Sequence, residues 1–290
     1  MDFEIVTDSS CNLTEDMIDE LGVHILPLVF MSEGKEYRSY LKGEKTDLKQ
    51  FYTMMREGKV FTTSLPNMAD AEALLRGLLE SGRDVLYLGF SSALSGTYEA
   101  VRLLCTQLAA EFPERTVRAV GTLAASGGQG LLVYHACKHA QAGASLEETA
   151  RWVEENRLHL AHWFTVDDLM FLLRGGRVSK VSAYMGTMLN IKPVMHVDDE
   201  GRLIPVEKVR GRKKAIQGLV KHMEETAQKP VADQPVFITH GDCPEDVEYL
   251  CDLIRKKFGD VQITVNYVDP VIGAHSGPGT LALFFLAEHR

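Results

Sequence analysis

The chain has 290 residues, of which 45% are hydrophobic and 24% charged, and its formal net charge is −9. The negative charge argues against nucleic acid as the main partner, because a phosphate backbone attracts a concentrated basic face. The longest apolar stretches, 23–31 and 281–287, are too short to span a membrane, and Asp2 and Glu4 stand where a signal peptide needs basic residues, so we expect a cytoplasmic protein.

The first half of the chain alternates strand and helix patterns. Short apolar runs predict strands over 3–7, 23–31, 85–90 and 116–120. Apolar residues at helical spacing predict helices over 70–80, 98–110 and 126–142. This alternation is typical of an α/β fold, in which helices cover both faces of a parallel sheet.

The second half has a different pattern. Two strand-like runs, 191–197 and 203–209, flank an Asp/Glu/Gly cluster that favours a hairpin turn. Further strands are predicted over 235–239, 261–268 and 281–286, with helices over 213–226 and 245–257. We therefore expect two domains: an N-terminal α/β domain over 1–150, and over 151–290 an α+β domain with a mixed or antiparallel sheet. The last segments could also return to the first domain.

Small polar residues follow several predicted strands, where open α/β sheets bind ligands. Ser95, Gly96 and Thr97 fall at the start of a predicted helix, whose free N–H groups and dipole favour an anion such as a phosphate or a carboxylate. Gly96 would let the backbone approach that anion closely. The alternative is that Ser95 or Thr97 only caps the helix.

Three further segments carry candidate site residues. Thr63 lies in a hydroxyl-rich stretch before Pro66, and a helix is expected after Asn67. His275 lies in the segment 273–280, whose three glycines and one proline predict a loop rather than a helix. Arg174 ends a short apolar helix before two glycines that suit a C-cap, and its guanidinium could face an anion.

No pattern for a metal or a cofactor is present in the sequence. The five cysteines are widely spread and form no CxxC pair, so we expect neither a zinc site nor thioredoxin chemistry. His159 and His162 lie near two aspartates, but no HExxH motif accompanies them. The glycine-rich segment 121–127 lacks the lysine of a P-loop, and no GxSxG motif of hydrolases occurs.

Taken together and in order, seven motifs resemble the DegV family of bacterial fatty-acid-binding proteins along nearly the whole chain. They are Thr7-Asp8-Ser9-Ser10, Thr63-Ser64-Leu65-Pro66, Ser91-Ser92-Ala93-Leu94-Ser95-Gly96-Thr97-Tyr98, Ser126-Gly127-Gly128-Gln129-Gly130, Gly175-Gly176-Arg177-Val178-Ser179, Ile191-Lys192-Pro193 and Gly273-Ala274-His275-Ser276-Gly277-Pro278-Gly279. The chain departs from the usual residues of this family at Gly121-Thr122, around Pro66 and at Gly211. These departures leave open which length of fatty acid would be preferred and which partner protein would dock.

The resemblance implies a long-chain fatty acid buried in a tunnel between two domains. Its carboxylate would be held by Thr63 and Ser95, with His275 nearby and Arg174 or Arg177 beside the entrance. The resemblance also implies that the chain is not an enzyme by itself and presents its ligand to a separate kinase that makes acyl phosphate. That kinase would dock on Lys208 and Arg210, and transient contact with a membrane surface is compatible with this role.

The residues themselves fit such a ligand. An unpaired carboxylate in an apolar cavity is very costly, so hydroxyls, the Gly96 N–H and the His275 imidazole would have to satisfy it. The tail needs a dry tunnel, since each buried methylene contributes roughly 0.8 kcal/mol. Candidate walls, any of which could also be ordinary core, are Phe164, Leu169, Met170, Leu172, Met185, Met188 and Leu189.

Two other functions stay open at this stage. Ser95 could be the nucleophile and His275 the base of a hydrolase or acyltransferase. The loops at the strand ends could instead hold a sugar phosphate or a nucleotide, although no acidic residue follows a GxGxxG pattern to bind a ribose.

Overall fold

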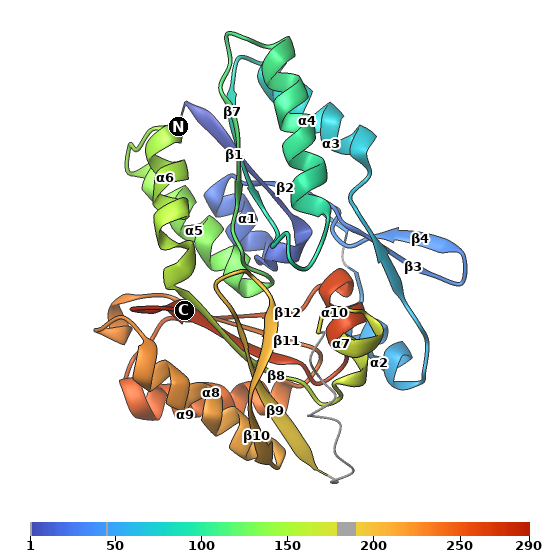
Figure 1. Ribbon diagram of the computed structural model, residues 1–290, viewed down its shortest axis with the longest axis vertical. Helices are drawn as coiled ribbons and strands as arrows, with labels where there is room; N and C mark the ends of the chain where they lie inside the picture. The colour runs from blue at the N-terminus through green and yellow to red at the C-terminus, as the bar shows by residue number, and fades with distance from the viewer. Residues whose placement is uncertain (1, 45, 179–189) are drawn as a thin grey trace.

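The computed structural model describes residues 2–44, 46–178 and 190–290. These residues form a four-stranded sheet, a six-stranded sheet and a small three-stranded sheet. The four-stranded sheet and its helices lie above the six-stranded sheet in Figure 1, and the small sheet projects to one side between them. Among the described helices, none combines the length and the apolar character that crossing a membrane requires.

The N-terminal sheet is parallel, with strand order β2-β1-β6-β7. Its strands are β1 (Phe3–Asp8), β2 (His24–Leu26), β6 (Asp84–Gly89) and β7 (Val117–Gly121). Helices α1 (Glu15–Leu21), α5 (Gly127–Gln141) and α6 (Leu146–Asn156) pack on one face, and α3 (Met68–Glu80) and α4 (Thr97–Glu111) on the other. The alternating side chains of β1 explain this arrangement, because Ile5 points into the first core and Val6 into the second. The predicted α/β architecture is confirmed.

The run 23–31, predicted as one strand, forms two strands in different sheets, because the chain changes sheet at Pro27. Proline has no N–H to donate, and Leu28 turns its own N–H to the Ser9 hydroxyl. The chain then enters the small antiparallel sheet of β3 (Val29–Ser32), β4 (Lys35–Arg38) and β5 (Thr62–Ser64). Helix α2 (Leu48–Arg56) packs against this sheet through Phe51, Tyr52 and Met55.

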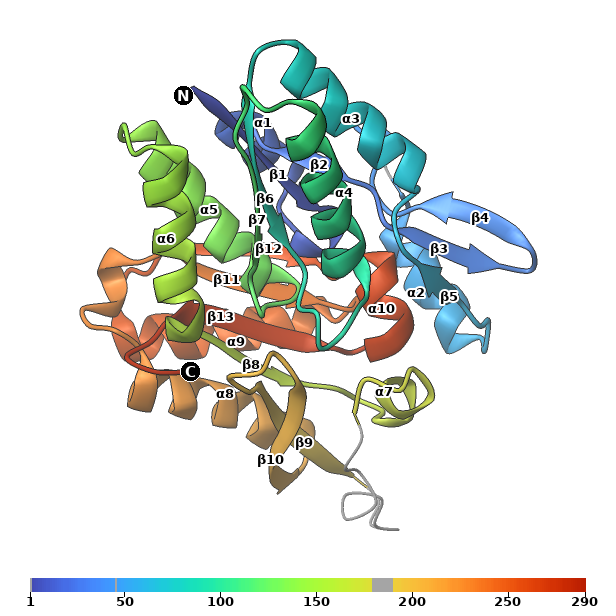
Figure 2. The ribbon, with the colours of Figure 1, turned by 45° about the horizontal axis from the view of Figure 1, so that its top comes forward.

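The C-terminal sheet is mixed, with strand order β10-β9-β8-β13-β11-β12. Its strands are β8 (Leu160–Thr165), β9 (Ile191–Val197), β10 (Leu203–Arg210), β11 (Val236–His240), β12 (Ile263–Tyr267) and β13 (Leu281–Leu286). The predicted hairpin between β9 and β10 is present and turns at Gly201. Helices α8 (Arg212–Thr226) and α9 (Pro244–Phe258) cover the outer face, and the other face meets α5. The mixed sheet is confirmed, and Figure 2 shows it lying beneath the N-terminal sheet.

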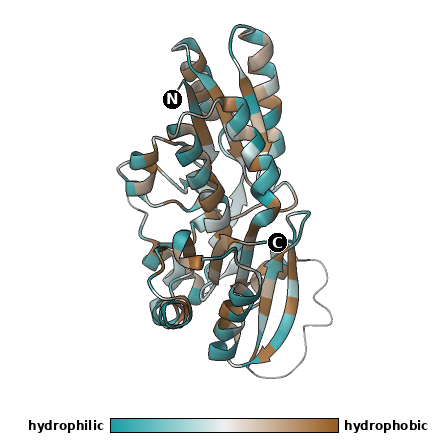
Figure 3. Cartoon of the chain, turned by 90° about the vertical axis from the view of Figure 1, so that its left-hand side faces the viewer, coloured by the Kyte–Doolittle hydropathy of each residue, from teal (hydrophilic) through white to brown (hydrophobic). Residues whose placement is uncertain are grey.

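The two sheets meet at the glycine-rich start of α5. A Cβ atom on Gly128 would lie 2.1 Å from Nε2 of His162 on β8, and one on Gly130 would lie 2.3 Å from the backbone oxygen of Cys11. Only residues without a side chain permit this close approach. Buried residues of both sheets pack into one cluster across the junction, among them Leu88, Phe164 and Phe284. Figure 3 shows hydrophobic residues along the strands and residues of both kinds on the helices. The junction therefore belongs to a continuous core.

The segment around His275 is a helix, which corrects the predicted loop. Helix α10 (Pro270–Ser276) starts with proline at its first position, and the Asp269 side chain accepts hydrogen bonds from two backbone N–H groups as its N-cap. It ends at Gly277, which has a positive φ of 82°. The glycine content misled the prediction because Gly273 serves packing: a Cβ there would lie 2.5 Å from the Tyr52 hydroxyl.

Candidate functional site

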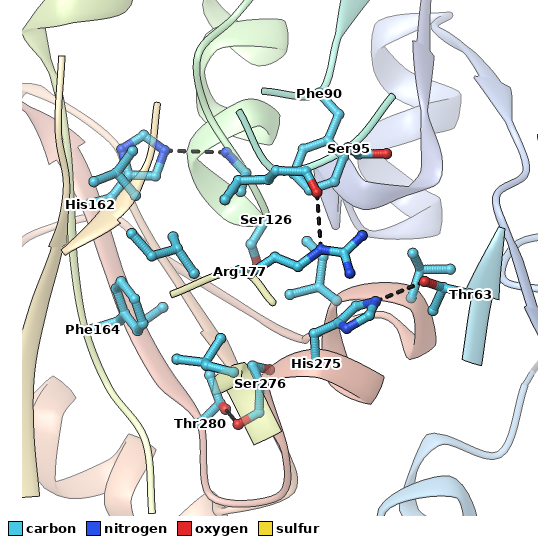
Figure 4. Close-up of a pocket in the computed structure, with 18 of the residues that line it drawn as sticks. Thr63, Phe90, Ser95, Ser126, His162, Phe164, Arg177, His275, Ser276 and Thr280 are labelled. Atoms are coloured by element: carbon cyan, nitrogen blue, oxygen red, sulfur yellow. Dashed lines mark hydrogen bonds between the residues drawn. The ribbon is translucent and has the colours of Figure 1, made fainter. Parts of the chain in front are cut away.

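A narrow apolar cavity lies between the two large sheets. Its walls include Phe90, Leu94, Phe164, Leu172, Val197 and Phe284, which come from both halves of the chain (Figure 4). Its volume is about 90 Å³, whereas pockets that hold a ligand typically measure roughly 300–1,000 Å³. We call this space the inner cavity. It suits an apolar group, and a large one would require its walls to move apart.

Thr63 and His275 close one end of the inner cavity. Thr63 lies in the middle of β5 and His275 in the last turn of α10, and Thr63 Oγ1 is 2.7 Å from His275 Nε2. Gly175, which follows α7 (Met170–Arg174), packs on the other ring nitrogen, since a Cβ there would lie 2.5 Å from His275 Nδ1. Residues 212 positions apart in the sequence are thus brought into one polar pair.

His275 is a neutral imidazole at neutral pH. Burial lowers the pKa of His275 from 6.5 to about 4, and the nearby Arg177 cation acts in the same direction. The ring can therefore donate from one nitrogen and accept at the other. A carboxylate beside the ring would stabilise the imidazolium form of His275, and would thus oppose the lowering of its pKa by burial and by Arg177.

A second, wider space adjoins this end of the inner cavity. It has a volume of about 730 Å³, and its lining residues come from the end of α2, from β5, from the segment around α7 and from the end of α10. We call it the outer cleft. Thr63, Arg177 and His275 line both spaces, so they form the boundary between a dry interior and a polar opening.

The two arginines lie differently with respect to this boundary. Arg177 lines both spaces, and its guanidinium donates to the backbone oxygens of Leu94 and Gly175. Arg174 lines only the outer cleft, where its guanidinium carbon lies 4.9 Å from the centre of the Phe171 ring. Of the two, Arg177 is the cation closer to the inner cavity.

Ser95 lines the inner cavity and also bonds to the first residue of helix α4. Its hydroxyl lies 2.9 Å from Thr97 Oγ1 and accepts a hydrogen bond from the Thr97 N–H at 3.2 Å. Gly96, expected to bring the backbone close to an anion, is the N-cap residue of α4 and does not line the inner cavity. The start of α4 thus lies beside the inner cavity, and Ser95 is the residue there that lines it.

The sequence interpretation missed several polar groups in the cavity wall. Ser126 has a positive φ of 55°, and its hydroxyl contacts Asn12 Oδ1 at 2.6 Å and Thr239 Oγ1 at 2.8 Å. His162 is buried, and its Nε2 accepts from the Ala125 N–H at 3.4 Å. Ser276 and Thr280 complete this set. The motif Ser126–Gly130 pointed to this region, but nothing in the sequence placed β8 against it.

The other predicted residues are spread over the molecule. Phe164 and Leu172 line the inner cavity, Leu169 packs against the core, and Met170 lies on the surface with 39% exposure. Met185, Met188 and Leu189 lie outside the described residues. Lys208 and Arg210 lie exposed on β10, the edge strand of the C-terminal sheet.

The geometry does not favour a serine hydrolase. In the described part of the chain, the hydrogen bonds of Ser95 go to Thr97 and that of His275 goes to Thr63. A nucleophile needs a hydrogen bond to its base, and the base needs an orienting acid. Ser95 and His275 share no hydrogen bond, and the His275 ring is bonded to Thr63 and not to an acid.

Comparison with known proteins identifies the chain. A sequence model described as an uncharacterised protein of the DegV family matches residues 2–288. The chain belongs to the DegV family. A DegV domain-containing protein of Clostridium perfringens is 41% identical to this DegV-family chain over 288 residues, which cover 99% of the chain and 98% of that protein.

Solved structures share the DegV fold over their full length. A DegV-family protein of Thermus thermophilus, described by its fatty acid binding, is 33% identical with a TM-score of 0.88 and covers 99% of this chain and 100% of its own. A DegV lipid-binding protein of Thermotoga maritima is 30% identical with a TM-score of 0.86 and complete coverage of both chains, 100% and 100%. DegV of Bacillus subtilis, described as a fatty acid binding protein, is 26% identical with a TM-score of 0.82 and covers 99% and 100%.

Proposed function

We propose that this DegV-family chain binds a long-chain fatty acid, with the tail in the inner cavity and the carboxylate at Thr63, Ser95 and His275. The observation that carries the proposal is the position of the Thr63–His275 pair at the end of an apolar cavity. Relatives of 30% and 33% identity over nearly the whole chain are described as lipid-binding and fatty-acid-binding proteins, which supports it.

The chemistry of this site suits an oily acid better than a phosphate. A phosphate carries more charge and would need several cations, whereas the described boundary offers one arginine, a neutral histidine and hydroxyls. A carboxylate accepts hydrogen bonds from such groups, and the apolar walls supply the free energy of binding. Because the inner cavity is narrow, we expect its aromatic and aliphatic walls to rotate aside when an acyl chain enters.

The direct test is lipid extraction of the purified protein followed by mass spectrometry. We expect the extract to contain a long-chain fatty acid. Protein that was first stripped of lipid should take up added hexadecanoate or oleate. Finding no acyl chain and no uptake would refute the proposal.

Replacement of Thr63 by valine should weaken fatty acid binding by about 1–3 kcal/mol, since one hydrogen bond to a charged group is lost while the shape of the side chain is kept. Binding can be measured by displacement of a fluorescent fatty acid. The matched control is Ser64→Ala on the same strand, because Ser64 is exposed and lines neither space. Equal losses in both variants would contradict a specific role for Thr63.

Loading with a fatty acid should raise the pKa of His275 above its value of about 4 in the empty protein. The direction follows because a nearby carboxylate stabilises the imidazolium, while Arg177 continues to oppose it. By linkage, binding should tighten as the pH falls toward the new pKa while the ligand stays ionised. Ring-nitrogen NMR of His275, assigned with His275→Gln, measures the shift. An unchanged pKa would place the carboxylate elsewhere.

We further propose that the chain presents its ligand to a separate fatty-acid kinase, and that Lys208 and Arg210 dock this partner. The carboxylate would lie at the boundary with the outer cleft, so a partner could reach it while the tail stays buried. The docking residues lie on an exposed edge strand of a chain whose net charge is −9, so they form a local basic site for an acidic partner surface.

Reversal of Lys208 and Arg210 to glutamate should leave fatty acid binding intact and impair kinase-dependent phosphorylation of the bound acid. The control is reversal of Lys229 and Lys256, which are also exposed and produce the same change in net charge. If both double variants support phosphorylation as well as the wild type, the docking site lies elsewhere.

A further inference from the structure

Ser276 differs from the other polar residues of the inner cavity. It is 5% exposed, and its hydroxyl is buried without a hydrogen-bond partner. In the described part of the cavity wall, it is the one residue with a buried side-chain polar atom in this state. Buried hydroxyls in folded proteins are nearly always paired, so an unpaired one in a binding cavity suggests a partner on the ligand.

The position of Ser276 indicates which part of a ligand it would meet. It follows His275 on α10, so it lies close to the carboxylate end of the cavity. It lines the inner cavity but not the outer cleft, in contrast to His275. In Figure 4 it lies between His275 and Thr280. Ser276 therefore lies on the inner-cavity side of the boundary residues, where the tail would be.

The neighbouring polar groups do not satisfy this hydroxyl. Thr280 Oγ1 donates to the backbone oxygens of Ser276 and Gly277, at 3.0 and 2.8 Å. Ser126 is paired with Asn12 and Thr239. A plain alkyl chain packed here would seal Ser276 from water with nothing to bond, which costs binding free energy.

We propose that Ser276 forms a polar subsite that selects acyl chains bearing a hydroxyl group within the first few carbons of the carboxylate. This inference rests on the proposed fatty acid binding and names the class of ligand within it, a 2- or 3-hydroxy fatty acid. The hydroxyl of such a chain can donate to Ser276 or accept from it, whereas the rest of the tail still meets apolar walls.

The test compares three acids of equal chain length on stripped protein: hexadecanoate, 3-hydroxyhexadecanoate and 16-hydroxyhexadecanoate. We expect the 3-hydroxy acid to bind roughly five- to tenfold more tightly than hexadecanoate, the effect of one net hydrogen bond. The 16-hydroxy acid, whose oxygen would enter the apolar end, should show no such gain. Ser276→Ala should remove the preference and bind hexadecanoate more tightly than the wild type does, because no buried hydroxyl is then left unpaired. Ser276→Thr should retain the preference.

The outcomes separate this inference from the function on which it rests. Binding of hexadecanoate without a preference for the 3-hydroxy acid overturns the subsite and leaves fatty acid binding in place. Equal weakening of both acids in Ser276→Ala also overturns it, because Ser276 would then hold the carboxylate. Failure of all three acids to bind overturns both. A thermal melt of each variant confirms that it is folded.

Discussion

Replacement of Gly130 by alanine should lower the free energy of unfolding by about 3 kcal/mol, near the upper end of the usual cost of overpacking a core. The new Cβ would lie 2.3 Å from the backbone oxygen of Cys11 and 3.3 Å from Leu13 Cδ2. A backbone oxygen cannot rotate aside as a side chain can, so either α5 or the segment after β1 must shift.

That segment has little freedom to shift, because buried hydrogen bonds fix it. The Ser10 hydroxyl donates to Gln129 on α5 at 2.7 Å and also contacts Asp8. Asp8 in turn accepts from the Tyr87 hydroxyl at 3.2 Å. The Cβ atom would have to move by about 0.7 Å to bring its 2.3 Å contact with Cys11 out to 3.0 Å, and a movement of that size would stretch this network.

Gly77 on α3 provides the matched control for Gly130. It also lies within a helix, but a Cβ there meets nothing within 4 Å. Gly77→Ala should therefore raise the free energy of unfolding by about 0.5–1 kcal/mol, because alanine loses less backbone entropy on folding. Urea denaturation of both variants gives the comparison. Similar stability changes of the same sign would show that helix propensity, and not the contact with Cys11, governs Gly130.

Arg290→Ala should destabilise the chain by about 2–4 kcal/mol, because it leaves four partly buried carbonyl groups without this donor. The Arg290 guanidinium donates to the backbone oxygens of Arg157 at 2.7 Å, Leu123 at 2.9 Å, Leu160 at 3.1 Å and Asp198 at 3.1 Å. These atoms belong to the loop before α5, the approach to β8 and the β9–β10 turn. Burial lowers the pKa of Arg290 to about 10, and the group stays charged at neutral pH.

The effect of Arg290→Ala should be concentrated at the β9–β10 turn. Apart from Arg290, the turn is fixed to the N-terminal half by the Ser91 hydroxyl, which donates to the Gly201 oxygen at 2.9 Å. Hydrogen exchange should therefore accelerate around the turn more than in α9. Arg255→Ala, at an exposed position on α9, is the control and should change stability by less than about 0.5 kcal/mol. Unaltered exchange at the turn would contradict the proposed role of Arg290.

The sequence predicted the elements that local patterns determine. The parallel sheet, the β9–β10 hairpin and the starts of α3 and α4 follow from periodicity and from capping residues such as Asn67. The resemblance placed Thr63 and His275 together, and the structure shows them 2.7 Å apart. Their roles as ligand contacts remain predictions.

The remaining features depend on contacts between distant segments. β5 consists of Thr62, Thr63 and Ser64, a polar triplet that becomes a strand only because β3 offers it hydrogen bonds. The positive φ of Ser126 and the unpaired hydroxyl of Ser276 arise from packing around the cavity. No spacing or composition rule encodes such relations, since the partners are distant in the sequence: the paired residues of β3 and β5 lie more than 30 positions apart, and the partners of Ser126 lie 114 and 113 positions away.

The walls of the inner cavity come from both sheets, so neither half of the chain contains the cavity by itself. An acyl chain bound in the inner cavity would contact both sheets and so stabilise their association. Without the acyl chain, the two halves would separate more easily. Proteases cleave transiently opened states, so an empty molecule should be degraded faster than a filled one. Through this one feature, the amount of the protein in a cell would follow the supply of its ligand.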